Sequence, residues 1–263
     1  MSQKEIPSET ENPRREFMQK TLFGASAFAG LSVASTSHAK VENPQKSLEP
    51  EVTNEVDILV VGSGSAGTTA AIQAGRAGAK TLLMERNSQL GGTTTTGGVA
   101  YPGLFDAWGK QVISGIGWEL VKESVELDGG KFPDFSKVPR VHHHNQIHIN
   151  QFLYSILAEE KCQEAGVEIA YYEFPTALTQ TENGWQVDCM GFGTKRRVIC
   201  KQIVDCTGGA EVVGLLGLER LRGEERQPGS YLFKIGDPHN PASSQLRRLY
   251  VHGADSTNSR TVT

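Results

Sequence analysis

Three glycines and one acidic residue have the types and the spacing that bind a dinucleotide. Gly62, Gly64 and Gly67 form a GxGxxG motif directly after the apolar run 57–61. In such a motif the first glycine permits a tight turn, the second lets a pyrophosphate approach the backbone, and the third lets the next helix pack closely. The free N–H groups and the positive end of that helix then face the phosphates.

Glu85 extends this motif because it ends a second apolar run, 81–84. At the end of a strand its carboxylate can accept hydrogen bonds from both ribose hydroxyls, and it disfavours a 2′-phosphate, which argues against NADP. The alternative is a tight strand–helix turn that holds no ligand. A strand before the glycines and a helix after them favour the dinucleotide site.

Two further segments have small residues where a cofactor would need them. Gly91 and Gly92 follow Glu85 within the run 86–98, which reads RNSQLGGTTTTGG. The run 202–209, QIVDCTGG, is an apolar strand that ends in Thr207-Gly208. The alternative for 86–98 is a flexible polar loop.

Together these segments resemble the FAD-dependent oxidoreductases of the glutathione-reductase-like fold, over about residues 55–235. They are most similar to the subgroup of heterodisulfide reductase-like flavoproteins. The resemblance implies FAD as the cofactor, with the Gly-Gly pair along the pyrophosphate and the flavin edge. The subgroup usually has Asp after Thr-Gly, whereas Gly209 stands here, so no acidic role is assigned at this point. The cofactor-binding residues implied are Gly62, Gly64, Ser65, Ala66, Gly67, Glu85, Arg86, Gly91, Gly92, Thr93, Thr94, Thr207 and Gly208.

The N-terminus has the pattern of a twin-arginine signal peptide, predicted over residues 1–39. Arg14 and Arg15 precede a mildly apolar run, 21–34, and Ser37-His38-Ala39 offers a cleavage site. The run is too short and too polar for a transmembrane helix, so no stable membrane insertion is expected. The pattern predicts a periplasmic or otherwise exported protein that acquires FAD before export.

The hydrophobic patterns predict an α/β fold, with a Rossmann-like parallel sheet and a three-stranded β-meander. We expect a linker at 40–54, an FAD-binding domain at 55–220 with a helical insertion at about 105–150, and a partial substrate domain with a polar tail at 221–263. Helices are expected at 68–77, 113–125 and after the capping residue Asn150. Strands are expected at 167–172, 177–181, 185–190, 195–200 and 231–235.

Charge and cysteine spacing narrow the function. The net charge of −4 over 263 residues gives no indication of a nucleic-acid partner. The four cysteines, Cys162, Cys189, Cys200 and Cys206, form no CxxC motif and no ferredoxin-type run. They are interpreted as buried or half-buried thiols, although export would also permit a disulfide.

His142, His143, His144 and His148 permit three interpretations: surface or pocket-lining side chains, a flavin-facing acid or base, or metal ligands. The first is favoured because no carboxylate lies within the cluster, and no metal is predicted. No catalytic acid or base is identified.

The main functional hypothesis is an exported FAD-dependent oxidoreductase that accepts a hydride from a small substrate and passes electrons to an unidentified acceptor. One alternative is an incomplete or non-catalytic flavin- or ADP-binding fragment of a longer flavoprotein, since no second glycine-rich segment follows residue 235. The other is an NAD-dependent dehydrogenase, against which the loop at 91–93 and the predicted meander argue.

Overall fold

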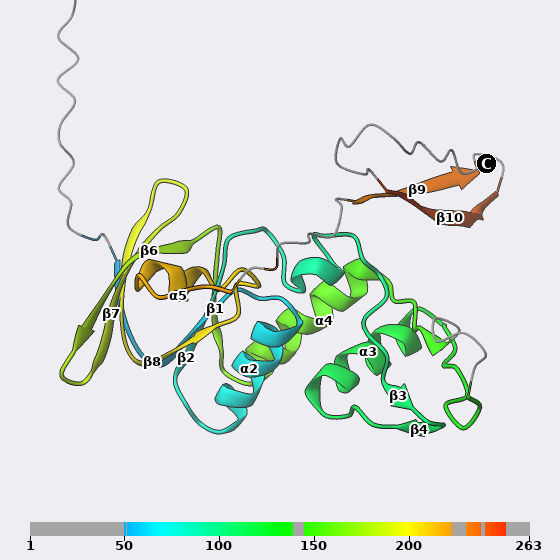
Figure 1. The fold of residues 1–263 in the computed structure, drawn as a ribbon, viewed down its shortest axis with the longest axis horizontal. Helices are drawn as coiled ribbons and strands as arrows, with labels where there is room; N and C mark the ends of the chain where they lie inside the picture. The colour runs from blue at the N-terminus through cyan, green and yellow to red at the C-terminus, as the bar shows by residue number, and fades with distance from the viewer. Residues whose placement is uncertain are drawn as a thin grey trace, which may run out of the picture. The chain divides into compact units, whose positions relative to one another are not determined.

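The computed structural model describes residues 50, 52–138, 145–221 and 223, together with the backbone of 230–237 and 240–250. The predicted signal peptide and the histidines at 142–144 lie outside these residues. Along the chain the elements are β1 (Val52–Val61), α2 (Ser65–Arg76), β2 (Thr81–Glu85), the 3₁₀ helix η1 (Gly92–Thr94), β3 (Asp106–Ala107), β4 (Lys110–Gln111), α3 (Ile116–Leu127), α4 (Gln151–Glu164), β5 (Glu168–Tyr171), β6 (Phe174–Thr181), β7 (Gly184–Met190), β8 (Lys195–Asp205), α5 (Glu211–Leu215), β9 (Ser230–Asp237) and β10 (Asn240–Tyr250) (Figure 1).

A six-stranded sheet in the order β5-β2-β1-β8-β7-β6 forms the centre of the fold. Strand β1 pairs in parallel with β2 and β8, and β5 pairs in parallel with β2. The antiparallel pairs β6–β7 and β7–β8 form the meander (Figure 1). The predicted α/β fold with a parallel sheet and a meander is confirmed. The meander continues the parallel sheet, because the single long strand β8 pairs with β7 on one side and β1 on the other.

Strand β1 begins at Val52, whereas the sequence pattern places the strand at 57–61. Its first residues pair with the early part of β8, so residues 52–54 of the predicted linker belong to the sheet. Asn54 is held there by side-chain hydrogen bonds with Glu168 of β5 and Arg196 of β8. These polar contacts join segments far apart in the sequence, and hydrophobic periodicity does not reveal them.

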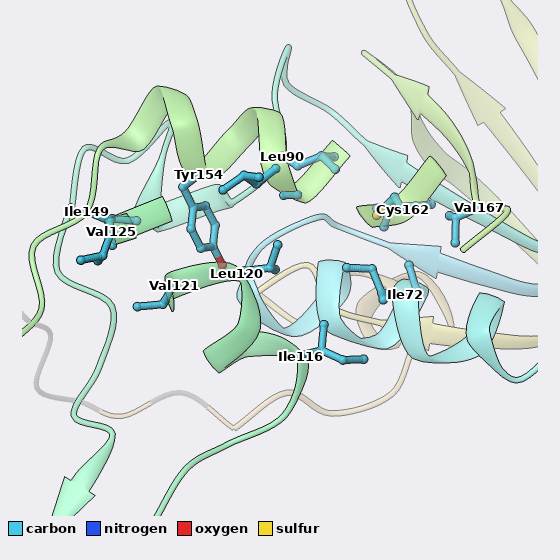
Figure 2. Packing of buried hydrophobic residues seen from close by; sticks show 14 of the residues in the cluster. Ile72, Leu90, Ile116, Leu120, Val121, Val125, Ile149, Tyr154, Cys162 and Val167 are labelled. Carbon is cyan, nitrogen blue, oxygen red and sulfur yellow. The ribbon is translucent and has the colours of Figure 1, made fainter. Parts of the chain in front are cut away.

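Hydrophobic side chains cover both faces of the central strands. Neighbouring residues of β1 and β2 contribute to opposite faces, as strand geometry requires: Val60 and Leu83 pack on one side, Leu59 and Leu82 on the other. The first face carries helices α2, α3 and α4, whose buried side chains gather in one cluster with Leu90, Ile149 and Val167 (Figure 2).

The apolar stripe predicted for α3 is buried from Ile116 to Val125. Ile113 precedes the helix and is largely exposed, so it does not belong to the stripe.

Helix α4 begins as predicted but buries a different face. The Asn150 Oδ1 accepts hydrogen bonds from the backbone N–H of Phe152 (3.1 Å) and Leu153 (3.4 Å), which confirms the cap. Phe152 and Ile156, expected on the apolar side, are 69% and 54% exposed. The buried residues are instead Tyr154, Ser155, Leu157, Ala158 and Cys162. The small Ser155 and Ala158 are compatible with close packing, and the buried Tyr154 hydroxyl shares a hydrogen bond with Ser65 of α2.

Strands β9 and β10 form an antiparallel hairpin, and β9 contains the strand predicted at 231–235. Among the residues that the structure describes, no helix combines the length and the apolar character needed to cross a bilayer.

The cap of α4 gives a stability prediction. Replacing Asn150 by Ala removes the acceptor for two N–H groups and the hydrogen bond to Asp128 (3.0 Å). We expect the free energy of unfolding in urea to fall by about 0.5–2 kcal/mol. As a control, Gln163→Ala on the exposed side of the same helix should change it by less than about 0.5 kcal/mol. Equal losses in the two variants would contradict a role for the cap.

Candidate cofactor site

A cavity of about 390 Å³ lies at the carboxyl ends of β1, β2 and β8 and beside the start of β6. Ligands of open α/β sheets bind at this edge, where the loops leave the strands. Its lining consists of Val61, Gly62, Ser63, Gly64, Met84, Glu85, Arg86, Asn87, Gly92, Thr93, Thr96, Gly97, Glu173, Phe174, Pro175, Cys206, Thr207, Gly208 and Glu211.

The three glycines of the motif differ in what the fold requires of them. Gly62 has φ +90°, and a Cβ there would lie 2.6 Å from the Cys206 carbonyl oxygen. A Cβ on Gly67 would lie 1.7 Å from the Gly62 carbonyl oxygen, so the turn excludes a side chain at both positions. A Cβ on Gly64 would meet no heavy atom within 4 Å, and its φ of −61° suits any residue. Folding therefore does not require a glycine at 64.

Helix α2 directs its N-terminus to the same cavity. Gly64 is its N-cap residue, and its carbonyl oxygen accepts the first helical hydrogen bond, from Thr68 (2.9 Å). No side chain caps this end, and the first turn contains no acidic residue. The unpaired N–H groups of a helix start and the helix dipole favour an anion at such a position.

The Gly-Gly pair packs against this turn. Gly91 has φ +106° and donates its N–H to the Ser63 carbonyl oxygen (2.8 Å). A Cβ on Gly92 would lie 2.8 Å from the Gly64 Cα. The Thr95 hydroxyl donates to the Leu90 carbonyl oxygen (2.6 Å). The segment after Glu85 is thus an ordered turn with a short 3₁₀ helix, and the alternative of a flexible polar loop is wrong.

Glu85 is 4% exposed and uses both carboxylate oxygens within the protein. Its Oε2 accepts hydrogen bonds from the N–H (2.9 Å) and the hydroxyl (2.6 Å) of Ser63. Its Oε1 accepts from the N–H and the Nδ2 of Asn87, both at 2.8 Å. The carboxylate therefore joins the turn after β1 to the turn after β2.

Asp205, the last residue of β8, holds the Thr207-Gly208 turn. Its Oδ1 accepts from the N–H (3.0 Å) and the hydroxyl (2.7 Å) of Thr207, and its Oδ2 accepts from the N–H of Val213 (3.2 Å). The Thr207 hydroxyl accepts in turn from the N–H of Glu211 (2.8 Å). Burial raises the pKa of Asp205, but these hydrogen bonds outweigh burial and hold it below its ordinary value of 3.8.

Glu173 and Arg196 form a half-buried ion pair near the start of β6. Arg196 Nε donates to Glu173 Oε2 (2.6 Å) and Nη2 donates to Oε1 (3.0 Å), a bidentate geometry. The Glu173 N–H donates to the Glu85 carbonyl oxygen (3.1 Å). The pair thus ties the segment 173–175 to the end of β2. A second pair, Arg86–Glu211 at 3.1 Å, is largely exposed and adds little stability.

The structure brings together Gly62, Gly64, Glu85, Arg86, Gly92, Thr93, Thr207 and Gly208 of the predicted site. Ser65, Ala66, Gly67, Gly91 and Thr94 lie in the same turns but do not line the cavity. Sequence reasoning missed Ser63, Asn87, Thr96, Gly97, Glu173, Phe174, Pro175, Cys206 and Glu211. The rule that ligands bind at the carboxyl ends of parallel strands would have indicated Ser63, Asn87 and the segment 173–175.

The histidine and cysteine hypotheses concern residues with other positions. His148 is exposed, outside the cavity lining, and its ring packs edge-on to Tyr101 with centroids 5.1 Å apart. Across the described part of the chain, no group of three His, Cys, Asp or Glu side chains could hold a metal ion. All four cysteines are free and buried or half-buried, as predicted. Burial raises the pKa of Cys162 and Cys189 to about 12.

A glycine turn, a helix N-terminus and an acidic residue at the carboxyl edge of a parallel sheet define a dinucleotide-binding α/β protein. Residues 57–260 match the model of the family described as FAD dependent oxidoreductase. The chain belongs to this family of enzymes, and its cofactor is FAD.

Individual relatives match parts of the chain. The pseudooxynicotine dehydrogenase of a Pseudomonas species is 39% identical over 88 residues, which are 32% of this chain and 17% of that protein. A Streptomyces rimosus enzyme, 12-dehydrotetracycline 5-monooxygenase/anhydrotetracycline 6-monooxygenase, is 28% identical over 172 residues, or 62% and 33% of the two chains. Among solved structures, the anhydrotetracycline hydroxylase from Streptomyces rimosus has a TM-score of 0.46 and 22% identity, covering 70% of this chain and 36% of that one. The chain thus spans a third or less of the length of these two curated relatives.

The Asp205 network gives a pH prediction. In Asp205→Asn the amide group would face N–H donors, so at neutral pH we expect the free energy of unfolding to fall by about 1–3 kcal/mol. Because the folded-state pKa of Asp205 is lowered, its stabilisation is present above 3.8 and lost as the pH falls through the folded value. The gap between wild type and variant in urea unfolding should therefore narrow below pH 3.8. A gap that stays constant down to about pH 2 would contradict this assignment.

Proposed function

We propose that the cavity binds the ADP part of FAD, and that Gly64 marks the pyrophosphate position. Gly64 lines the cavity at the start of α2, although packing leaves room for a side chain there. A side chain at this position would occupy the space that the phosphates need next to the helix N–H groups. Gly92 and Thr93 supply backbone and a small hydroxyl on the facing side of the cavity.

The remaining lining suits the adenosine. Glu85 and Asn87 provide polar groups for the ribose next to the pyrophosphate position. Beyond them, Phe174 and Pro175 offer apolar surface for a planar base. Cofactor pockets combine this kind of apolar surface with a few polar groups that set the orientation. Arg86, Thr207 and Gly208 complete the proposed site.

We propose that the protein is an oxidoreductase that takes a hydride from a reduced small substrate. FAD supplies this chemistry when bound, and the chain binds and orients it. Family membership supports the proposal, as does the similarity to a dehydrogenase and a monooxygenase. The closer kinship with glutathione-reductase-like and heterodisulfide reductase-like flavoproteins belongs to the same proposal, supported by the meander β6–β7–β8. The electron acceptor is unidentified.

A second candidate function is an ADP- or flavin-binding part of a longer flavoprotein. The observation in its favour is that all the features assigned above match the ADP moiety, and none of them is assigned to the flavin ring. An NAD-dependent dehydrogenase is not proposed, because FAD is the cofactor of the family.

Substituting Gly64 tests the proposed function. Gly64→Val should weaken FAD binding about a hundredfold, or about 2.7 kcal/mol, and leave the fold intact. Gly103→Val is the matched control, because a Cβ there also meets open space and Gly103 lies outside the cavity lining. Circular dichroism checks folding, and calorimetric titration of the full chain measures binding.

Unchanged FAD affinity in a folded Gly64→Val protein would contradict the phosphate position. The same titrations with ADP separate the two candidate functions. Similar affinities for ADP and FAD would favour the binding fragment, whereas FAD binding about a hundredfold tighter would require contacts to the flavin ring.

We also propose export through the twin-arginine pathway to the periplasm, on the basis of Arg14, Arg15 and the apolar run that follows. The double variant Arg14→Lys, Arg15→Lys keeps the charge but should leave the precursor in the cytoplasm, because a receptor recognises the pair. Cell fractionation and immunoblotting measure this, with Lys20→Arg as the charge-conserving control. Mature double variant in the periplasm would refute the proposed route.

A further inference from the structure

The Glu85 carboxylate has no acceptor position to spare. An ionised carboxylate offers about four lone-pair sites, two on each oxygen. Ser63 occupies both positions on Oε2 with its N–H and hydroxyl, and Asn87 occupies both positions on Oε1 with its N–H and Nδ2. A ribose hydroxyl can therefore bond to Glu85 only if one of these donors gives way.

The four donors differ in how readily they can leave. Two are backbone N–H groups in the turns after β1 and β2. Ser63 is completely buried, and its carbonyl oxygen also accepts from Gly91 and Thr68, so its surroundings are fixed. Asn87 is half-buried and lines the cavity. Rotation about its side-chain torsions would withdraw Nδ2 while its backbone N–H stays on Oε1.

We propose that Asn87 is a specificity-determining residue whose Nδ2 occupies the Glu85 position that a ribose hydroxyl takes over on binding. This inference rests on the proposed function. With no nucleotide bound, the Asn87 side chain keeps a buried charge paired, since burying an unpaired charge is costly. When a nucleotide binds, the hydroxyl replaces the Asn87 amide on Oε1, and the other three donors hold the carboxylate in place.

The exchange has a measurable consequence, because Asn87 competes with the ribose. Breaking the Asn87–Glu85 bond weakens binding of nucleotides whose hydroxyl takes its place. A nucleotide that lacks this hydroxyl leaves the bond intact and is insensitive to Asn87. Asn87 thus lowers affinity for the ribose hydroxyl that reaches Oε1, which is the opposite of the effect of an ordinary contact residue.

The test is calorimetric titration of the full chain with ADP, 2′-deoxy-ADP and 3′-deoxy-ADP. Asn87→Ala should bind ADP several-fold to about tenfold tighter than the wild type, the scale of a hydrogen bond to a charged group. The deoxynucleotide that lacks the exchanging hydroxyl should bind both proteins equally. The other deoxynucleotide should gain as much as ADP. Gln89→Ala, two residues away and bonded to Thr96 rather than Glu85, is the control and should change nothing.

Three outcomes would overturn the exchange. Weaker ADP binding by Asn87→Ala would show that Asn87 contacts the nucleotide directly, and unchanged binding would show that no exchange occurs. An equal gain for all three nucleotides would place the effect away from the ribose. Thermal unfolding checks that the variant folds, and Asn87→Ser, which keeps a small polar side chain, serves as the second variant and should gain less than Asn87→Ala.

Glu85→Ala separates this inference from the proposed function. It should weaken ADP binding roughly 10- to 150-fold, because it removes an acceptor from the ribose. If the wild type binds no ADP, or Glu85→Ala binds it unchanged, the proposed site itself is wrong. If Glu85→Ala loses affinity as expected while Asn87→Ala gains none, only the exchange is wrong.

Discussion

The structure of the site depends on the buried carboxylate of Glu85. Its oxygens hold the turn after β1 through Ser63 and the turn after β2 through Asn87. Its own carbonyl oxygen holds Glu173, beyond the end of β5. A buried charge must be compensated by hydrogen bonds, so these turns cannot move independently of one another. The cavity therefore has a wall that is defined before any ligand enters it.

The glycines of the motif divide into those the chain needs and one that a ligand would need. Gly62 and Gly67 let the backbone pass where any side chain would collide with it, and Gly91 and Gly92 let a second turn pack on the first. Gly64 is free of such contacts. This difference separates the geometry that builds the turn from the geometry that leaves space beside it.

Strand β8 joins the two parts of the sheet and also positions the far side of the cavity. Its partners are parallel β1 on one side and antiparallel β7 on the other. Near its start, Arg196 holds Glu173, and at its end Asp205 holds Thr207. One long strand thereby places residues at both ends of its length, which explains how the meander contributes to the site.

The features that the sequence determined by itself are local. The turn at Gly62, the cap at Asn150 and the hairpin at 182–184 depend on residues within a few positions of one another, and the structure contains all three. The parallel strands could be predicted because their hydrophobic runs are long enough to be buried on both faces. Family-level resemblance supplied the cofactor.

Tertiary structure alone decided the pairing of distant groups. The sequence pattern does not show that Arg196 meets Glu173, that β1 extends back to Val52, or that α4 buries Tyr154 instead of Phe152. Each outcome depends on which segments become neighbours in the sheet or the helix layer, and a polar residue is buried only where such a neighbour supplies its hydrogen bond. The occupied state of Glu85 has the same origin: the strand pattern predicts an acidic residue at the site, but only the folded turns determine which donors reach it.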